Sequence, residues 1–256
     1  MAWLIFYDCF KREVGTFFHC ITAGEGKTIM DNFEMSDAFD LRFERGSTHL
    51  VVGPSASGKT FRTCDILKNK DSMIRDGESI RNVIFCYSVW QPIYSEMQRA
   101  GVVAKFVNKK PTCQEFTDMV KPFADKGGSI VVIDDFMGQI DSDLVDIVTV
   151  HSRHNNVVTF ILFQSLFPPN KLARQISLNV RYIHLHKNPR ENSQVQTLAR
   201  QLSPKNYKWI VQAYHHVTQT PHSAFLFDLT QGREENLRYR SHYLPKELPM
   251  RAYMAK

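Results

Sequence analysis

One octapeptide constrains the fold of this chain more than any other feature of its sequence. It reads Gly53-Pro54-Ser55-Ala56-Ser57-Gly58-Lys59-Thr60 and fits in full the pattern GxxxxGK followed by Ser or Thr. The apolar run Thr48–Val52 before it predicts a buried strand, and the pattern over Lys59–Leu67 predicts a helix. A glycine-rich loop between a strand and a helix N-terminus points several backbone N–H groups at one spot, which suits a phosphate.

The residue types of the loop predict the chemistry of nucleoside triphosphate binding. Glycines let the backbone wrap a phosphate, Lys59 can reach the β- and γ-phosphates, and the Thr60 hydroxyl can bind Mg²⁺. ATP and Mg²⁺ are therefore the expected substrate and cofactor. A second GKT string, Gly26-Lys27-Thr28, has Ile21 where the first glycine is needed and no helical pattern after it. We interpret that string as a surface turn.

A second candidate element is the apolar run Ser129–Ile133, which ends in Asp134 and Asp135. We expect Asp134 to hold Mg²⁺, largely through water, and Asp135 to orient or polarise the attacking water. Alone, such a run is equally a short strand with a solvated acidic turn, but the upstream loop favours the catalytic interpretation. Asp135 also opens a DxxG string of the GTPase kind. The base-reading motif of GTPases is missing, since Asn69-Lys70-Asp71 has the wrong spacing and lies too early.

The apolar run Val157–Phe163 stops at Gln164, whose amide can bond the γ-phosphate or the attacking water. The order of loop, acidic strand end and polar strand end predicts a P-loop ATPase with an additional strand between the loop strand and the acidic strand. The helix before this run ends in His151-Ser152-Arg153-His154, where cations favour a helix C-terminus. Alternatively, Arg153 projects toward the nucleotide of a neighbouring subunit as an arginine finger. Arg174 and Arg190 are the other candidates for that role.

From His49 onward, short apolar runs alternate with amphipathic helical patterns, which predicts βαβ units and an α/β fold with a mainly parallel sheet. We expect three layers, an irregular extension over residues 1–46, an ATPase domain over 47–240 and a loose tail over 241–256. Thr112 and Glu115 form a capping box at the start of one helix. Further expected strands are Trp3–Tyr7, Thr16–Ile21, Asn82–Ser88, Val102–Val107, Tyr182–His186 and Ala224–Asp228, and further helices are Gln91–Ala100, Thr112–Ala124, Asp141–His154, Gln194–Gln201 and Lys205–His216.

Composition excludes several other classes of protein. The five cysteines form no CxxC pair, so a disulfide framework and a structural zinc site are disfavoured, and we expect a reducing compartment. No apolar run approaches the length of a membrane span, and the first residues lack the basic segment of a signal peptide. The net charge of +6 is spread unevenly along the chain. Residues 1–170 carry −3, and the part from Lys171 onward carries +9, with 14 Lys and Arg against 5 Asp and Glu. That part is either a polyanion-binding surface or a solvated basic face.

Several stretches together resemble the FtsK/HerA-type genome-packaging ATPases, especially those of polinton-like and adintovirus elements and of large DNA viruses such as poxviruses. The resemblance covers roughly residues 48–240. Its discriminating parts lie near His151-Ser152-Arg153-His154-Asn155 and Lys187-Asn188-Pro189-Arg190. The stretches that carry it are Gly53–Thr60, Val131–Asp135, His151–Asn155 with Gln164, Lys187–Arg190 and Gln196–Gln201.

This resemblance implies a homo-oligomeric ring at a capsid portal or vertex, in which ATP turnover drives double-stranded DNA into a preformed shell. It implies capsid or portal proteins as partners, no membrane, and a place in the host nucleus or at the site of virus assembly. The basic C-terminal third agrees with a DNA-facing surface. The second acid of the family is often Glu, so Asp135 is one methylene shorter than the pattern.

Three other classes remain open at this point. A cellular DNA translocase or helicase is a near relative. A small-molecule or nucleotide kinase shares the loop, but it uses an Arg-rich lid and needs no water-activating second acid. A non-catalytic module that binds DNA under nucleotide control is the third. We expect the aromatic residues Tyr87, Trp90 and Tyr94 to pack rather than to contact DNA.

Overall fold

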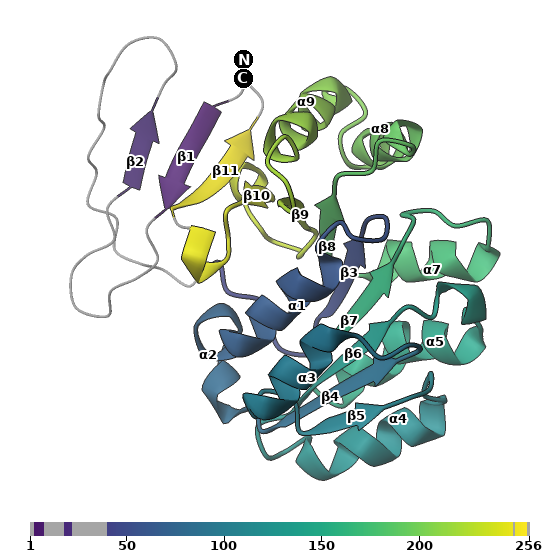
Figure 1. The fold of residues 1–256 in the computed structure, drawn as a ribbon. Coiled ribbons are helices and arrows are strands. Elements are labelled where there is room, and N and C mark those ends of the chain that lie inside the picture. Colours follow the sequence, from purple (N-terminus) through teal and green to yellow (C-terminus); the bar gives the residue numbers. More distant parts are fainter. Residues whose placement is uncertain (1–2, 8–17, 22–39, 248, 255–256) are drawn as a thin grey trace. The chain divides into compact units, whose positions relative to one another are not determined.

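The computed structural model of the chain describes residues 3–7, 18–21, 40–247 and 249–254. Their contacts divide the chain into two units (Figure 1). The central unit is Arg42–His184, and the terminal unit combines Met1–Leu41 with Leu185–Lys256. Among the described helices, none is long and apolar enough to cross a bilayer.

The central unit is built on a parallel sheet whose strands run in the order β8-β3-β7-β6-β4-β5. The pairs from β3 to β5 are all parallel, and β7 lies between the strand before the octapeptide and the strand of the two aspartates. This arrangement confirms the predicted additional strand. The strands are β3 (Thr48–Val52), β4 (Asn82–Tyr87), β5 (Lys105–Val107), β6 (Ser129–Asp134), β7 (Val157–Phe163) and β8 (Tyr182–His186), of which the last ends in the terminal unit.

Helices cover both faces of this sheet, as the handedness of βαβ connections requires. The chain moves from β3 to β4 and β5 through α1 and α3, and it returns to β6, β7 and β8 through α4, α5 and α7, so the two sets lie on opposite faces (Figure 1). The fold is thus the predicted three-layer α/β arrangement. The helices are α1 (Lys59–Lys68), α2 (Lys70–Met73), α3 (Pro92–Arg99), α4 (Cys113–Val120), α5 (Ser142–Asp146), the π-helical turn η5 (Ile147–His151), α6 (Ser152–His154) and α7 (Lys171–Asn179).

The central strands are buried along their whole length. Every residue of β3, β6 and β7 is buried, including the polar Thr159. Strands covered on both faces need near-continuous apolar sequence, which is why these segments read as apolar runs rather than as alternating patterns. The Thr159 hydroxyl is satisfied by a hydrogen bond of 2.7 Å with the hydroxyl of Ser152.

The terminal unit contains an antiparallel arrangement of strands in the order β2-β1-β11-β10-β9. Two helices, α8 and α9, pack against each other in the same unit. The strands are β1 (Trp3–Tyr7), β2 (Phe18–Ile21), β9 (Ala224–Asp228), β10 (Tyr239–Ser241) and β11 (Met250–Met254), and the helices are α8 (Asn192–Leu202) and α9 (Tyr207–Val217).

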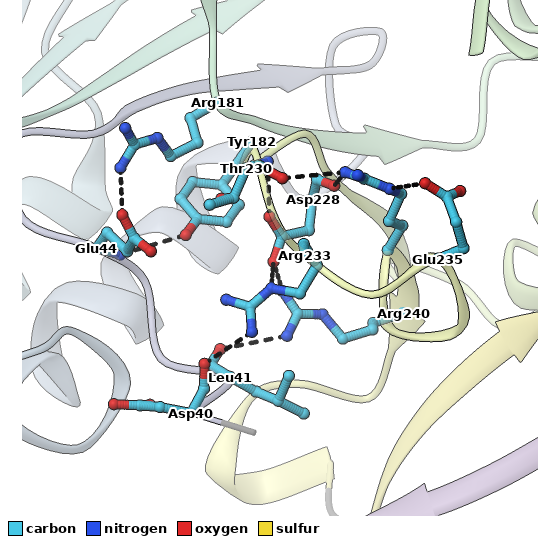
Figure 2. A network of polar contacts seen from close by, with 11 residues as sticks. Asp40, Leu41, Glu44, Arg181, Tyr182, Asp228, Thr230, Arg233, Glu235 and Arg240 are labelled. Carbon is cyan, nitrogen blue, oxygen red and sulfur yellow. Dashed lines mark hydrogen bonds and ion pairs between the residues drawn. The ribbon is translucent and has the colours of Figure 1, made fainter. Parts of the chain in front are cut away.

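A buried ion cluster organises this unit around Asp228 (Figure 2). The Oδ2 atom of Asp228 accepts from Nη2 of Arg240 at 2.7 Å and from Nε of Arg233 at 3.0 Å, and the side chains of Asp228 and Arg240 are fully buried. The two guanidinium groups also donate to the backbone carbonyls of Asp40 and Leu41. The cluster therefore fixes the segment before the central unit to β9 and β10.

Some expectations about the elements need correction. The tail is not loose, because Met250–Met254 form β11 and pair with β10. By their contacts, the two units change over after Leu41 and after His184, and the expected domain bounds at residues 46 and 240 stay a prediction. The strand expected over Val102–Val107 is only Lys105–Val107, and helix α7 was not predicted. The capping box at Thr112 is confirmed, while Gly26-Lys27-Thr28 lies outside the described residues.

Candidate nucleotide-binding site

The octapeptide forms a loop at the carboxyl end of β3 and leads directly into α1. Its first residue is fixed to the neighbouring strand, since the N–H of Gly53 donates to the carbonyl of Phe163 at 3.2 Å. Gly58 caps α1 with a φ of 98°, a conformation that L side chains rarely adopt. The turn therefore needs glycine where the motif has it, and the N-terminus of the ten-residue helix α1 follows at once.

Lys59 folds back over the loop. Its ammonium donates to the carbonyls of Gly53 at 2.6 Å and of Pro54 at 2.9 Å. Burial lowers the pKa of this ammonium, and the nearby carboxylates of Asp134 and Asp135 oppose that shift. The ammonium of Lys59 thus lies against the backbone of the loop, and the charges of Asp134 and Asp135 affect its pKa.

The loop and the acidic strand meet at Asp134. The Thr60 hydroxyl donates to Oδ2 of Asp134 at 3.0 Å, and the Tyr94 hydroxyl donates to the same oxygen at 2.8 Å. Asp134 is only 3% exposed, and this burial raises its pKa, while the two hydroxyl donors and Lys59 act in the opposite direction. The structure therefore brings the two metal-site candidates, Thr60 and Asp134, into direct contact.

This pair of oxygens fits Mg²⁺. A hydroxyl and a carboxylate are hard oxygen ligands, and Mg²⁺ in phosphate sites takes one or two protein ligands and completes its shell with water and phosphate oxygens. In the described part of the chain there is no group of three or more His, Cys, Asp and Glu that could hold a metal by itself. Thr60 and Asp134 would accordingly hold Mg²⁺ together with a bound triphosphate.

The carboxylate of Asp135 accepts hydrogen bonds from residues at the ends of β4 and β7, the two neighbours of β6. Its Oδ2 accepts from the Ser88 hydroxyl at 3.2 Å, just beyond β4, and its Oδ1 accepts from the Gln164 amide at 3.1 Å, just beyond β7. The backbone of Asp135 has a φ of 65°, in the left-handed region. Such conformations cost energy and concentrate at functional sites. The turn and the two donors fix the direction of an exposed carboxylate.

Arg153 is not brought to the loop of its own chain. It lies in α6, the last turn of the helix that precedes β7, at the edge of the sheet where the parallel strands begin, while the loop and Gln164 lie where they end. A strand of seven residues spans about 23 Å at the usual rise. Arg153 is exposed there, so its predicted role toward a neighbouring subunit stays a prediction. Arg174 is exposed on α7, and Arg190 belongs to the terminal unit.

Two residues of the site were missed by sequence reasoning. Tyr94 was expected only to pack, and its ring does contact those of Phe85 and Tyr87, but its hydroxyl also binds Asp134. Ser88 was read only as the last residue of a strand. The signal that singled out Gln164, a polar residue at the carboxyl end of a parallel strand, applies equally to Ser88.

Comparisons with known proteins give the following result. No family model matches the sequence, and no curated protein is similar to it in sequence. Among solved structures, the chain is similar to B204, the DNA-packaging ATPase of Sulfolobus Turreted Icosahedral Virus, with 14% identity, a TM-score of 0.46, and coverage of 72% of this chain and 93% of that one. It is also similar to a KaiC-like protein of Pyrococcus horikoshii, with 10% identity, a TM-score of 0.43, and coverage of 79% and 90%.

A third structure, the N-terminal domain of zonular occludens toxin from Neisseria meningitidis, has 18% identity, a TM-score of 0.35, and coverage of 57% of this chain and 78% of that one. Likenesses this remote carry no weight for function. The strand order and the loop at the end of β3 are sufficient to identify the fold. It is that of a P-loop NTPase with an additional strand between the loop strand and the acidic strand.

Proposed function

We propose that this chain is the ATP-hydrolysing subunit of a motor that packages double-stranded DNA into a preformed capsid. The observation that carries the ATPase part is the contact of Thr60 with Asp134 beside the loop, together with Asp135 held between Ser88 and Gln164. The packaging part is supported by the resemblance of the stretches around His151–Asn155 and Lys187–Arg190 to the packaging ATPases.

The residues of the site have distinct tasks in hydrolysis. The loop N–H groups and Lys59 bind the β- and γ-phosphates and stabilise the charge on the transferred phosphoryl group. Mg²⁺, when bound, neutralises charge on the phosphate oxygens. Asp135 orients a water molecule and accepts its proton as the water oxygen bonds to the γ-phosphorus. The bond from that phosphorus to the β–γ bridging oxygen breaks, which leaves ADP and inorganic phosphate.

Asp135 favours hydrolysis over phosphoryl transfer by a kinase. A kinase transfers the phosphoryl group to a substrate hydroxyl and has no need of a carboxylate that is aimed at water from beyond the acidic strand. Here the carboxylate is clamped by two donors and exposed, so water can reach it. Gln164, which donates to Asp135, would sense the γ-phosphate in this proposal. A cellular DNA translocase would use the same site, and it would differ from a packaging motor only in its partners.

The test is the release of inorganic phosphate from ATP with and without duplex DNA. We expect Mg²⁺-dependent phosphate release that rises on addition of DNA, and a fall of at least about a hundredfold in Lys59→Ala, since one lost electrostatic contact of this kind costs that much. Lys68→Ala is the matched control, because Lys68 is an exposed lysine at the other end of the same helix.

Three outcomes would contradict the proposal. Unchanged turnover in a folded Lys59→Ala variant would show that this site does not hydrolyse ATP. Transfer of the phosphoryl group to an added small-molecule hydroxyl, with no free phosphate, would indicate a kinase. DNA binding without any turnover in the wild type would indicate a nucleotide-controlled binding module.

A further inference from the structure

The helix pair α8–α9 in the terminal unit is unusual in its charge. The 36 residues from Asn192 to Phe227 contain neither Asp nor Glu. The same stretch carries Arg200, Lys205 and Lys208, and all three are exposed. Exposed surfaces normally mix both signs of charge, so a stretch with cations alone favours the binding of an anion.

The three cations gather at one end of the helix pair. Arg200 lies near the end of α8, and its guanidinium carbon is 4.4 Å from the centroid of the Tyr207 ring at the start of α9. Its Nη2 atom also donates to the Tyr207 hydroxyl at 3.2 Å. Lys205 lies in the short connection between the helices and Lys208 follows Tyr207, so all three cations lie on or next to this turn.

Arg200 links the two helices through Tyr207, but Lys205 and Lys208 form no hydrogen bond or ion pair with the described part of the chain. The buried side of the pair is formed by other residues, which are Val195, Leu198 and Ala199 on α8 and Ile210, Ala213, Tyr214 and Val217 on α9. Among the described residues, no carboxylate forms an ion pair with Arg200, Lys205 or Lys208. The contrast is with Arg233 and Arg240, which also belong to the basic C-terminal third but are buried against Asp228.

We propose that the turn between α8 and α9 binds the phosphate backbone of duplex DNA without regard to sequence. This inference rests on the proposed function, and it assigns the DNA contact to one surface of the terminal unit. Exposed Lys and Arg without nearby acids attract the phosphates, and their binding releases counterions from the duplex. Arg200 is held by Tyr207 with its charge at the surface, so it needs less ordering when DNA binds.

The test is the affinity for a fluorescently labelled duplex, measured by anisotropy over a series of salt concentrations without nucleotide. The variant is Lys205→Gln with Lys208→Gln. The control is Lys121→Gln with Lys126→Gln, a matched pair of exposed lysines in the central unit. We expect the variant to bind at least about tenfold more weakly, with a slope of log affinity against log salt that is smaller by about 2, since each lost phosphate contact removes about 0.9. The control should behave as wild type.

Two outcomes would contradict the assignment of DNA binding to the turn between α8 and α9. One is an unchanged affinity and salt slope in the Lys205/Lys208 variant. The other is equal competition by poly-glutamate and by unlabelled duplex, which would indicate an acidic protein partner instead of DNA. Failure of the proposed function looks different, because turnover in Lys59→Ala tests the nucleotide site and leaves the turn between α8 and α9 intact. The basal turnover of the Lys205/Lys208 variant without DNA should match the wild type.

Discussion

At the scale of single residues, Asp134 combines two demands that oppose each other. The site needs a charged carboxylate beside Thr60, but burial of that carboxylate disfavours its charge and raises its pKa. A raised pKa in the folded protein means that the native state binds a proton more readily than the unfolded chain. The contribution of Asp134 to stability is therefore lost as pH rises from its ordinary value of 3.8 through the raised value.

Replacement of Asp134 by Asn separates the two demands. We expect Asp134→Asn to lose Mg²⁺-dependent turnover by at least about a hundredfold, and to be more stable than the wild type at neutral pH. The stability difference should shrink as pH falls toward 3.8, because Asp134 becomes neutral in the wild type as well. Thermal unfolding of both proteins from pH 3.8 to 7 measures this. A wild type that is more stable than the variant at pH 7 would contradict it.

Ser88 provides a second test at this scale. Ser88→Ala removes one of the two donors to Asp135 and touches no residue of the loop. We expect kcat for ATP to fall on the order of tenfold, as the loss of an orienting hydrogen bond would give, with KM unchanged. Ser88→Thr keeps a hydroxyl and should restore kcat. In an Asp135→Asn background the Ser88→Ala change should have no further effect, and an additional loss there would show that Ser88 acts elsewhere.

The candidate site was partly predictable from the sequence, and the reason lies in strand ends. The loop that leads to Lys59, the acid Asp134 and the amide Gln164 each come directly after an apolar run, and the carboxyl ends of parallel strands gather at one edge of a sheet. Their convergence needs no knowledge of side-chain packing. The contact of Tyr94 with Asp134 joins residues 40 positions apart through the packing of α3, which no local pattern reveals.

At the scale of elements, the π-helical turn η5 depends on tertiary contacts. The Ser152 hydroxyl donates to the carbonyl of Ile147 at 2.6 Å, five residues back, and it also bonds Thr159 on β7 at 2.7 Å. π-helical turns are rare and interrupt the α-helical ladder. The apolar pattern over Asp141–His154 predicted one helix correctly but contains no signal for the wider turn.

Replacement of Ser152 tests this dependence. Ser152→Ala leaves the buried hydroxyl of Thr159 without its partner, so we expect a loss of about 1–3 kcal/mol of stability. Ser142, an exposed residue at the start of α5, is the control, and Ser142→Ala should change stability by less than about 0.5 kcal/mol. Urea unfolding measures both. Equal stabilities of the two variants would mean that the Ser152 contacts contribute nothing.

The elements that the sequence failed to predict have weak local signals. Helix α7 has only Ala173, Ile176 and Ser177 on its buried side, and two prolines precede it, so the segment resembles a loop. Strand β11 pairs with β1, whose residues lie at the other end of the chain, and the prolines near it also favour a loop. By contrast, β7 and β8 are long buried runs that end at polar residues, and their predicted bounds are confirmed.

At the scale of the whole molecule, the terminal unit depends on buried charges (Figure 2). Asp228→Asn would remove the buried carboxylate that Arg233 and Arg240 share, so we expect a loss of about 3–5 kcal/mol. Glu235→Gln is the control, because Glu235 pairs with Arg238 at the surface and should cost less than about 1 kcal/mol. Denaturant midpoints compare the two. A stable Asp228→Asn variant would show that hydrogen bonds alone hold the cluster.

Assembly into a ring makes a separate prediction at this scale. If Arg153 acts on the nucleotide of a neighbour, mixtures of Arg153→Ala and Lys59→Ala subunits should regain part of the turnover that each lacks alone. Some interfaces of a mixed ring combine an intact Lys59 with an intact Arg153. The same mixing with Arg174→Ala and Arg190→Ala ranks the three candidates. Full activity of Arg153→Ala by itself would eliminate that residue.

The left-handed turn at Asp135 bears on why a short acid stands where packaging ATPases often have glutamate. Asp and Asn enter this region of backbone space far more readily than most side chains, because a short polar group can bond nearby backbone. Glutamate would have the same charge but would fit that backbone less well. The shorter side chain of Asp135 thus fits the left-handed turn that directs its carboxylate. On an unchanged backbone, Asp135→Glu would place the carboxylate beyond the position where Ser88 and Gln164 donate to it.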